Sequence, residues 1–357
     1  MHRADSTTER LTEAIVRYSV ERTHLDPPPL DHPKTQSELQ ASVGETITEH
    51  GIGGLEALRV FTDLLAPACI SVDHPRFLSF VPAAPTDSAI LFDLVVGASS
   101  IYGGSWMEGA GAVFAENQAL RWIADLVGLP DGAGGVFVSG GTAGNLSALV
   151  AARLRWREAA GVARGGTRGI VLASAGAHSS VKAAAHVMDV EALLVPADDR
   201  GRMTGPALRA AVAALSRDER ERVFAVVATS GTTNAGVIDD LATVAEVAAS
   251  LEAWFHVDGA YGGAALVVPG LRDRFAGIEH CDSFIVDPHK WLFAPFDCCA
   301  LVYRDPLQAR HAHRQHAEYL DVLHDDEEWN PSDFAHHLSR RARGLPFWFS
   351  LAAHGTA

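Results

Sequence analysis

The stretch SFIVDPHKWL, residues 283–292, is an apolar strand that stops at a proline and then presents a single lysine. Lys290 has Val286, Trp291 and Leu292 near it in the sequence, so apolar side chains flank its amine. Desolvation disfavours the ammonium form, and a neutral lysine amine is a nucleophile that forms a Schiff base with an aldehyde. Taken alone, the stretch fits equally well a surface lysine that follows a strand.

A second stretch, WFHVDGAYGG at residues 254–263, is a short buried strand that ends in Asp258 and then in small residues. In an α/β protein, a carboxylate at the carboxyl end of a strand faces the crevice where ligands bind. Such an acid can keep a pyridine nitrogen protonated, which a pyridoxal cofactor needs in order to accept electrons. An aspartate that caps a turn is the alternative. The two stretches together are more specific than either one alone.

The segments HVDGAY (residues 256–261) and DPHKW (287–291) resemble signatures of the group II pyridoxal 5'-phosphate (PLP)-dependent amino-acid decarboxylases. That family includes aromatic-L-amino-acid, glutamate, cysteine-sulfinate and diaminobutyrate decarboxylases. The resemblance runs from about His74 to the end of the chain. It implies an α/β large domain of PLP fold type I (aspartate-aminotransferase-like), with a mainly parallel central sheet, helices on both faces and an N-terminal helical arm before it.

The resemblance also implies a homodimer with PLP bound at the subunit interface. Lys290 would form the Schiff base, and Asp258 would hold the pyridine nitrogen. The matching segments supply further cofactor contacts, which are Ala260, Asp287 and His289.

The stretch GVFVSGGTAGNL, residues 135–146, is predicted to be a strand, a glycine turn and a helix that continues to about Arg157. The turn leaves backbone N–H groups free, and the helix N-terminus adds positive potential, so together they favour a phosphate. The segment matches neither a Walker A motif nor a GxGxxG fingerprint. In the family that the chain resembles, this segment cradles the PLP phosphate, with Gly141 and Thr142 at the matching positions.

Two further strand ends carry polar side chains. A strand at residues 170–173 leads to His178, and the apolar run at 223–229, typical of a doubly covered parallel strand, leads to Thr233. His178 either caps its own helix or stacks on a flat cofactor. The resemblance favours stacking, with catalytic help at the substrate carboxylate, and puts Thr233 near the ring. The alternation of strands and helices from 135 to 303 predicts a parallel α/β sheet.

The loop at residues 74–85 is rich in proline and aromatic residues, and in the family it lines the substrate pocket. Ala83 replaces a threonine of the aromatic decarboxylases. A second pocket wall corresponds to residues 99–106, where Gly104 replaces a bulky aromatic residue. A wider pocket there suits a large ring such as indole, or a non-standard substrate. The residues implicated in substrate binding are Phe80, Val81, Pro82, Tyr102 and Gly104.

Tyr319 matches a family tyrosine that returns a proton to the substrate after CO2 leaves, whereas family members with phenylalanine there tend to form an aldehyde. Tyr319 therefore favours decarboxylation of an L-amino acid, with an aromatic or other apolar side chain, to the amine and CO2. A packing role is the alternative for this tyrosine. The catalytic set is Lys290, His178, Tyr319 and Asp258. Transamination, aldehyde synthesis and C–S lysis use the same cofactor machinery, and a PLP-binding remnant without turnover is a further alternative.

The composition excludes several classes of protein. The chain has 357 residues, is 48% apolar, and carries 29 basic against 44 acidic residues, so a nucleic-acid partner is not expected. No apolar run is long enough to span a bilayer, and the N-terminus lacks the core of a signal peptide. The four cysteines form no CxxC pair, and the adjacent Cys298 and Cys299, in an apolar strand, indicate buried free thiols of a cytoplasmic protein. No compact ligand set among the 17 histidines indicates a metal site.

Two regions are expected along the chain. Residues 1–75 form an N-terminal helical arm for dimerisation, with helical spacing at 5–24 and 51–66. Residues 76–357 form the PLP-binding large domain. Family members continue into a C-terminal domain, which this chain is expected to lack.

Overall fold

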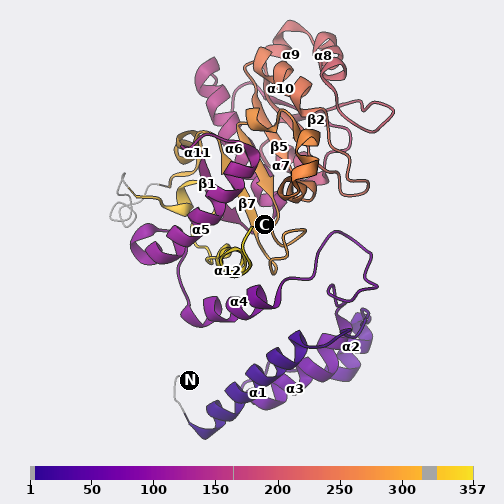
Figure 1. Ribbon diagram of the computed structural model, residues 1–357, viewed down its shortest axis with the longest axis vertical. Coiled ribbons are helices and arrows are strands. Elements are labelled where there is room, and N and C mark those ends of the chain that lie inside the picture. Colours follow the sequence, from indigo (N-terminus) through magenta and orange to yellow (C-terminus); the bar gives the residue numbers. More distant parts are fainter. Residues whose placement is uncertain (1–4, 164, 316–327, 357) are drawn as a thin grey trace. The chain divides into compact units, whose positions relative to one another are not determined.

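The computed structural model describes residues 5–163, 165–315 and 328–356. The chain forms two compact units, Met1–Phe80 and Val81–Ala357, which are coloured from indigo to yellow along the sequence in Figure 1. The first unit is helical, and the second, called the main unit below, contains a sheet with helices around it.

The first unit contains α1 (Ser6–Thr23), α2 (Gln36–Val43) and α3 (Gly54–Val60). Asp5 caps α1 by accepting hydrogen bonds from two backbone N–H groups, and Thr35 and Glu38 form a reciprocal capping box on α2. The single helix predicted over residues 51–66 is instead α3 followed by a π-helical turn at Phe61–Leu65 and a 3₁₀ turn at Ala66–Ala68. Proline at position 67 cannot supply a helical N–H, which accounts for the tightened end.

A seven-stranded sheet forms the centre of the main unit, in the spatial order β1-β7-β6-β5-β4-β2-β3. All its neighbouring strands are parallel except that β7 is antiparallel to both β1 and β6. This arrangement confirms the predicted mainly parallel α/β sheet. The strands are β1 (Gly134–Val138), β2 (Ile170–Ser174), β3 (Glu191–Val195), β4 (Val223–Thr229), β5 (Trp254–Asp258), β6 (Ser283–Val286) and β7 (Cys299–Tyr303).

Helices cover both faces of the sheet (Figure 1). Buried side chains of α6, α7 and α11 pack on one face, and those of α5, α8, α10 and α12 pack on the other. Every residue of β4 is buried, which explains its uninterrupted apolar sequence. The helices are α4 (Asp87–Ser99), α5 (Trp106–Val127), α6 (Gly141–Ala160), α7 (Ser179–Val187), α8 (Gly205–Ala214), α9 (Arg217–Glu221), α10 (Leu241–Ser250), α11 (Pro306–His313) and α12 (Leu345–His354).

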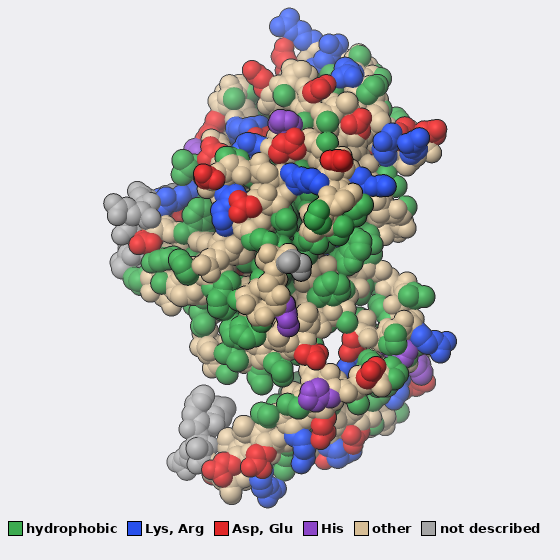
Figure 2. Space-filling model, viewed as in Figure 1, with side chains coloured by type: hydrophobic (Ala, Val, Ile, Leu, Met, Phe, Trp, Pro, Cys, Tyr) green, Lys and Arg blue, Asp and Glu red, His purple; other side chains and the backbone are tan. Residues whose placement is uncertain are grey.

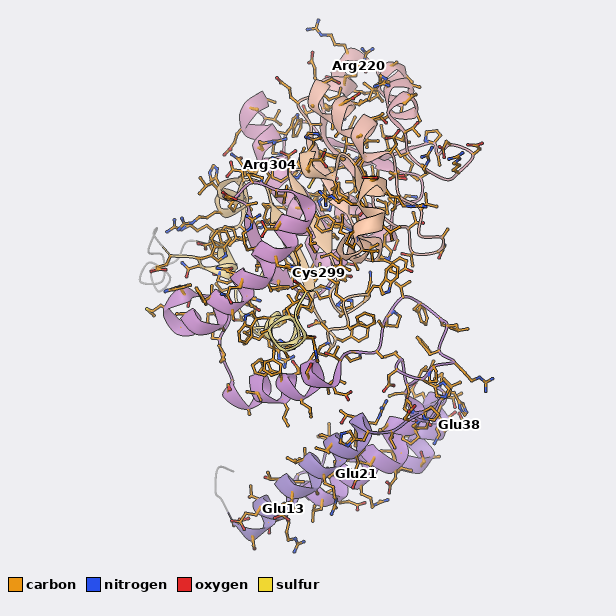
Figure 3. The ribbon with its side chains drawn as sticks, viewed as in Figure 1. Glu13, Glu21, Glu38, Arg220, Cys299 and Arg304 are labelled. Atoms are coloured by element: carbon orange, nitrogen blue, oxygen red, sulfur yellow. The ribbon has the colours of Figure 1, made fainter. Side chains whose placement is uncertain are left out.

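Short 3₁₀ turns complete the main unit at Gly262–Val267, Pro269–Phe275, Ile278–His280 and Pro331–Asp333. Cys299 lies in the middle of the main unit on β7 (Figure 3) and is a buried free thiol. No helix in the described part of the chain is both long and apolar enough to cross a membrane.

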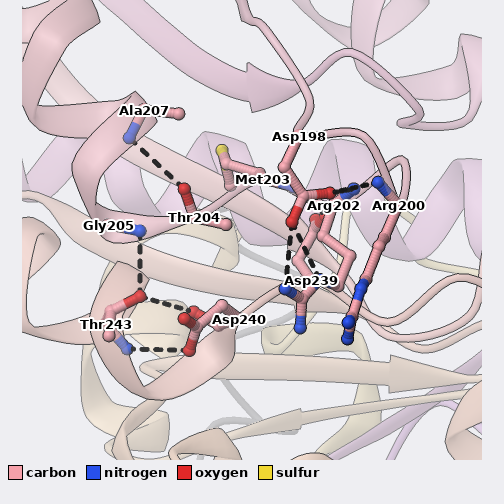
Figure 4. A network of polar contacts seen from close by, with 10 residues as sticks. All are labelled: Asp198, Arg200, Arg202, Met203, Thr204, Gly205, Ala207, Asp239, Asp240 and Thr243. Atoms are coloured by element: carbon pink, nitrogen blue, oxygen red, sulfur yellow. Dashed lines mark hydrogen bonds and ion pairs between the residues drawn. The ribbon is translucent and has the colours of Figure 1, made fainter.

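Asp239, one of the residues drawn in Figure 4, joins the carboxyl ends of two strands. Its carboxylate accepts hydrogen bonds from Thr229 N at the end of β4 (2.8 Å), from Ser174 Oγ at the end of β2 (3.2 Å) and from Met203 N (2.6 Å). Burial raises the pKa of Asp239 to about 6, and the three donors oppose that rise. Asp239 therefore holds together the starts of the two loops that follow β2 and β4.

Candidate active site

The loops that follow five strands meet at one edge of the sheet. Because β1 and β6 are both antiparallel to β7, β1 points in the same direction as β2, β4, β5 and β6. Ligands of open α/β sheets bind at the carboxyl ends of such strands. The loops surround a cavity of about 240 Å³. It is lined by Gly140, Gly141, Thr142, Asn145, Gly176, His178, Ser180, Thr229, Gly231, Thr232, Thr233, Asp258, Ala260, Tyr261, Asp287, His289 and Lys290.

Every residue that was predicted from the sequence to bind the cofactor lines this one cavity. These residues are Gly141, Thr142, His178, Thr233, Asp258, Ala260, Asp287, His289 and Lys290. Sequence reasoning missed other lining residues, above all Asn145 and Ser180, which lie on the first turns of α6 and α7. Asn145 belongs to the glycine-rich stretch at residues 135–146, but nothing in its local sequence distinguishes it from an ordinary helix residue.

The amine of Lys290 faces a carboxylate. Its Nζ lies 3.0 Å from Oδ2 of Asp287, a side chain that is only 2% exposed. The apolar sequence neighbours do not enclose the amine, because Trp291 and Phe293 are 46% and 44% exposed. The polar surroundings of the amine thus differ from the apolar surroundings that the sequence suggested, since the chain turns after Pro288 and carries those aromatic side chains outward.

His289 lies on the same carboxylate. Its Nδ1 accepts a hydrogen bond from Cys298 N at 3.0 Å, so the ring proton is on Nε2, which is 3.6 Å from Asp287 Oδ2. Burial lowers the pKa of His289, against the attraction of Asp287. His289 therefore supports the acid that pairs with Lys290.

Asp258 is buried at the end of β5 and accepts two hydrogen bonds. Ala260 N donates to Oδ1 at 3.0 Å, and Asn145 Nδ2 donates to Oδ2 at 2.8 Å. A carboxylate has about four lone-pair positions, so two remain for a ligand in the cavity. This arrangement suits a ligand that offers an N–H or a ring N⁺–H.

His178 caps α7 and lines the cavity as well, so the two interpretations of its role are compatible. Its Nδ1 accepts a hydrogen bond from Ser180 N at 3.2 Å and lies 2.9 Å from Ser180 Oγ. The capping contact uses only Nδ1, and the rest of the imidazole remains available to a bound molecule.

The amino end of α6 has the features of an anion-binding site. No side chain caps this 20-residue helix, and Gly140, Gly141 and Thr142 bring its first turn to the wall of the cavity. A Cβ added to Gly141 would lie 3.2 Å from Ala260 Cβ and 3.4 Å from Asp287 Oδ2, so a larger residue would crowd this wall of the cavity. Unsatisfied N–H groups at a helix N-terminus bind phosphate well.

The residues nominated for substrate binding lie elsewhere. Val81, Pro82, Tyr102 and Gly104 belong to the main unit but are not among the lining residues of the cavity. The ring of Tyr102 fills the space that a side chain at Gly104 would need, so Gly104 does not open a gap within one chain. Phe80 is in the first unit and is 83% exposed, and Tyr319 lies outside the described residues.

The cavity fits PLP by the chemistry of its walls. An uncapped helix N-terminus suits a phosphate, a buried carboxylate suits a pyridinium nitrogen, and one primary amine can bond an aldehyde. The cavity volume of about 240 Å³ is several times that of a water molecule. These features on this sheet define a PLP-binding protein of fold type I.

Comparisons with known proteins identify the family. Residues 54–357 match the model described as "Pyridoxal-dependent decarboxylase conserved domain". The chain is 30% identical to aromatic-L-amino-acid decarboxylase of Bacillus atrophaeus, over 94% of this chain and 69% of that protein. It is 35% identical to L-2,4-diaminobutyrate decarboxylase of Rhizobium meliloti (strain 1021), over 87% of this chain and 62% of that protein. The chain belongs to the pyridoxal-dependent decarboxylase family.

A solved structure agrees with this assignment. Oryza sativa TDC, crystallised with PLP and tryptamine, superimposes with a TM-score of 0.88 at 26% identity, covering 98% of this chain and 74% of that one. The chain spans about two thirds of the length of the curated relatives named above. The predicted fold type and cofactor are thereby confirmed.

Proposed function

We propose that the protein decarboxylates an L-amino acid to the corresponding amine and CO2. The observation that carries this proposal is one cavity that joins the Lys290 amine, the Asp258 carboxylate and the free amino end of α6. PLP, when bound, supplies an electron sink for the pair of electrons left when the carboxylate leaves.

The residues of the chain have separate tasks in this proposal. Lys290 would hold the cofactor through its aldehyde until the substrate amine takes its place. Asp258 would keep the ring nitrogen protonated, and the first turn of α6 with Thr142 would hold the phosphate. His178 would stack on the ring and orient the substrate carboxylate. Holding the breaking C–C bond perpendicular to the ring would lower the activation barrier by roughly several kcal/mol.

The proposed substrate has an aromatic or other apolar side chain. Sequence similarity to aromatic-L-amino-acid decarboxylases supports an aromatic ring, while the similarity to diaminobutyrate decarboxylases makes an amine-bearing side chain the second candidate. Tyr261 lines the cavity, and its ring stacks on the outward-facing ring of Trp291 with 5.5 Å between the ring centroids. An apolar surface of this kind favours the first candidate.

A panel of L-amino acids tests the function. The purified protein is incubated with PLP and, in turn, tryptophan, phenylalanine, tyrosine, 2,4-diaminobutyrate or glutamate, and both CO2 and amine are measured. We expect amine and CO2 in equal amounts from an aromatic substrate. A keto acid without CO2 would identify a transaminase. PLP binding without any product from the panel would identify a remnant without turnover.

The same panel tests Tyr319, which we propose as the group that returns a proton to Cα. Tyr319→Phe is expected to lower the amine yield, because the substrate carbon then lacks its proton donor. The unprotonated carbon would instead be oxidised by dissolved O2, which is reduced to H2O2, and water would release the aldehyde and NH3. An unchanged ratio of amine to CO2 would remove Tyr319 from the mechanism.

We further propose a homodimer with the site at the subunit interface, in which the helical arm, residues 1–75, contacts the partner and residues 76–357 hold PLP. Apolar side chains are exposed on α1 (Ile15, Val16 and Val20) and on α4 (Leu91, Leu94 and Val95). Figure 2 shows hydrophobic side chains gathered on the lower part of the main unit. The substrate positions at Tyr102 and Gly104 would then serve the partner's cavity.

Light scattering tests the homodimer. A single chain has a mass of 38.0 kDa, and we expect twice that mass in solution. Val16→Asp together with Val20→Asp should shift the mass to that of a monomer, since both side chains are half-exposed in one chain. A wild-type mass of one chain would contradict the proposal. Four unpaired cysteines fit a cytoplasmic location, which we propose on that ground.

A further inference from the structure

Three polar-tipped side chains of β5 point to the same face of the sheet. Trp254, His256 and Asp258 alternate along the strand, and each is at most 4% exposed. Helix α6 covers this face, and its Asn145 is 1% exposed. A row of buried polar groups is costly unless each is hydrogen-bonded, so their partners show what the row does.

The partners form one continuous chain of hydrogen bonds, which starts far from the cavity. Trp254 Nε1 donates to Ser283 Oγ at 2.7 Å, and the indole N–H can only donate. The single proton of Ser283 is then free to point to Nδ1 of His256, 2.7 Å away. His256 and Ser283 are opposite each other in the register of β5 and β6, so the strands themselves fix this contact.

Because Nδ1 of His256 accepts, its proton lies on Nε2, which is 2.8 Å from Asn145 Oδ1. Complete burial lowers the pKa of His256, so the ring is neutral and has only this one N–H. The amide of Asn145 therefore has a single orientation, with its carbonyl toward His256 and its NH2 toward the cavity.

The two N–H bonds of Asn145 reach two residues of the site. One goes to Asp258 Oδ2 and the other to Ser180 Oγ, each at 2.8 Å. Ser180 Oγ, having accepted, donates its proton to Nδ1 of His178 at 2.9 Å. Since Nδ1 of His178 also accepts from Ser180 N, the proton of a neutral His178 lies on Nε2.

We infer that Asn145, oriented by His256, is a positioning residue that sets two site residues at once. It aims the Asp258 carboxylate and, through Ser180 Oγ, reinforces the Nε2–H tautomer of His178 that the backbone N–H of Ser180 already favours. The catalytic part of this inference rests on the proposed decarboxylation, whereas the tautomers are a property of the protein by itself. Asparagine is needed because this position requires one acceptor and two donors, which neither aspartate nor an apolar residue supplies.

Nuclear magnetic resonance of the histidine rings tests the inference without cofactor. In long-range ¹H–¹⁵N spectra of the protein free of PLP, His256 and His178 are expected as neutral Nε2–H tautomers. Asn145→Leu removes all three hydrogen bonds at similar volume. The Nδ1–H fraction of His178 should rise, because Ser180 Oγ is then free to accept from Nδ1 and only the longer contact with Ser180 N still favours Nε2–H. Asn145→Asp, the second variant in case the first does not fold, offers only acceptors, draws the Ser180 proton away and should also change His178.

Ser147→Ala is the matched control. Ser147 is equally buried on α6, and its Oγ lies 3.0 Å from His336 Nδ1, outside this chain of hydrogen bonds. It should leave the signals of His178 and His256 unchanged. An Nδ1–H tautomer of His178 in the wild type, or an unchanged His178 in both Asn145 variants, would overturn the inference.

Measurements with PLP give the catalytic part. With ¹⁵N in the pyridine ring of bound PLP, Asn145→Leu should move the nitrogen signal toward the unprotonated form. The ratio kcat/KM should fall by about 10- to 100-fold, the range known for residues that orient metal-binding histidines. Full activity of Asn145→Leu, with an unchanged ring-nitrogen signal, would contradict the catalytic part of the inference. If the wild type gives no amine while the tautomers change as expected, the proposed function fails and the assignment of Asn145 as the residue that orients Asp258 and His178 stands.

Discussion

Lys290→Ala is expected to abolish covalent attachment of PLP and to lower kcat/KM for amine formation by about 10³-fold or more, as loss of a catalytic nucleophile does in other enzymes. The amine of Lys290 is held at 3.0 Å from Asp287 on the cavity wall. Reduction of the PLP-loaded protein with borohydride, followed by mass analysis of its peptides, should find the cofactor on Lys290 in the wild type and on no residue in the variant.

The chain contains two other lysines, Lys34 and Lys182, which make the experiment well controlled. Both are exposed, and neither lines the cavity. Lys182→Ala should retain attachment and activity. Cofactor fixed by borohydride in Lys290→Ala would show that another amine holds PLP, and the assignment of the motif at residues 287–291 would be wrong.

The sequence was informative where function depends on short, ordered segments. Asp258 ends β5 and Lys290 lies in the loop that follows β6, and the parallel sheet brings the ends of these two strands to the same edge. Gly141 and Thr142 follow β1 in the same way. A motif at the end of a strand therefore predicts position as well as chemistry, because the direction of the strand determines where its loop emerges.

The missed features depend on contacts between distant parts of the chain. Asn145 reaches Asp258 only because α6 packs on the face of β5 that carries the alternating polar side chains. The environment of the Lys290 amine was misjudged for a related reason, since Asp287, three residues earlier, contacts it while the adjacent Trp291 points outward. Local sequence shows which residues are near along the chain, but not which face they share.

Glu116 illustrates the same limit, and it leads to the largest expected effect on stability. Glu116 lies in the interior of α5, which begins at Trp106, and nothing near it in the sequence indicates its partner. Its carboxylate forms a two-fold ion pair with Arg340, at 2.7 and 2.9 Å, and also accepts from Gly344 N at 2.7 Å. The side chains of the pair are 2% and 1% exposed.

Arg340→Met is expected to lower the free energy of unfolding by about 3–5 kcal/mol, because Glu116 would remain buried without its cation. The Arg340 guanidinium also donates to Gly103 O, so the loop before α5 should loosen with its loss, although the backbone bond from Gly103 N to Arg340 O remains. Urea unfolding followed by tryptophan fluorescence measures the loss. Arg341→Met is the control, since Arg341 pairs with Asp93 at a half-exposed site and should cost at most about 1 kcal/mol.

The double variant Arg340→Met with Glu116→Gln distinguishes the pair from simple loss of packing. If the unpaired charge causes the damage, removing it should recover part of the stability, and the double variant should be more stable than Arg340→Met alone. If the double variant is less stable by the sum of the two single losses, the charges do not interact energetically. The Glu116–Arg340 contact would then contribute through packing and through the bonds to Gly103 and Gly344, and its ion pair would have no part in fixing the loop that precedes α5.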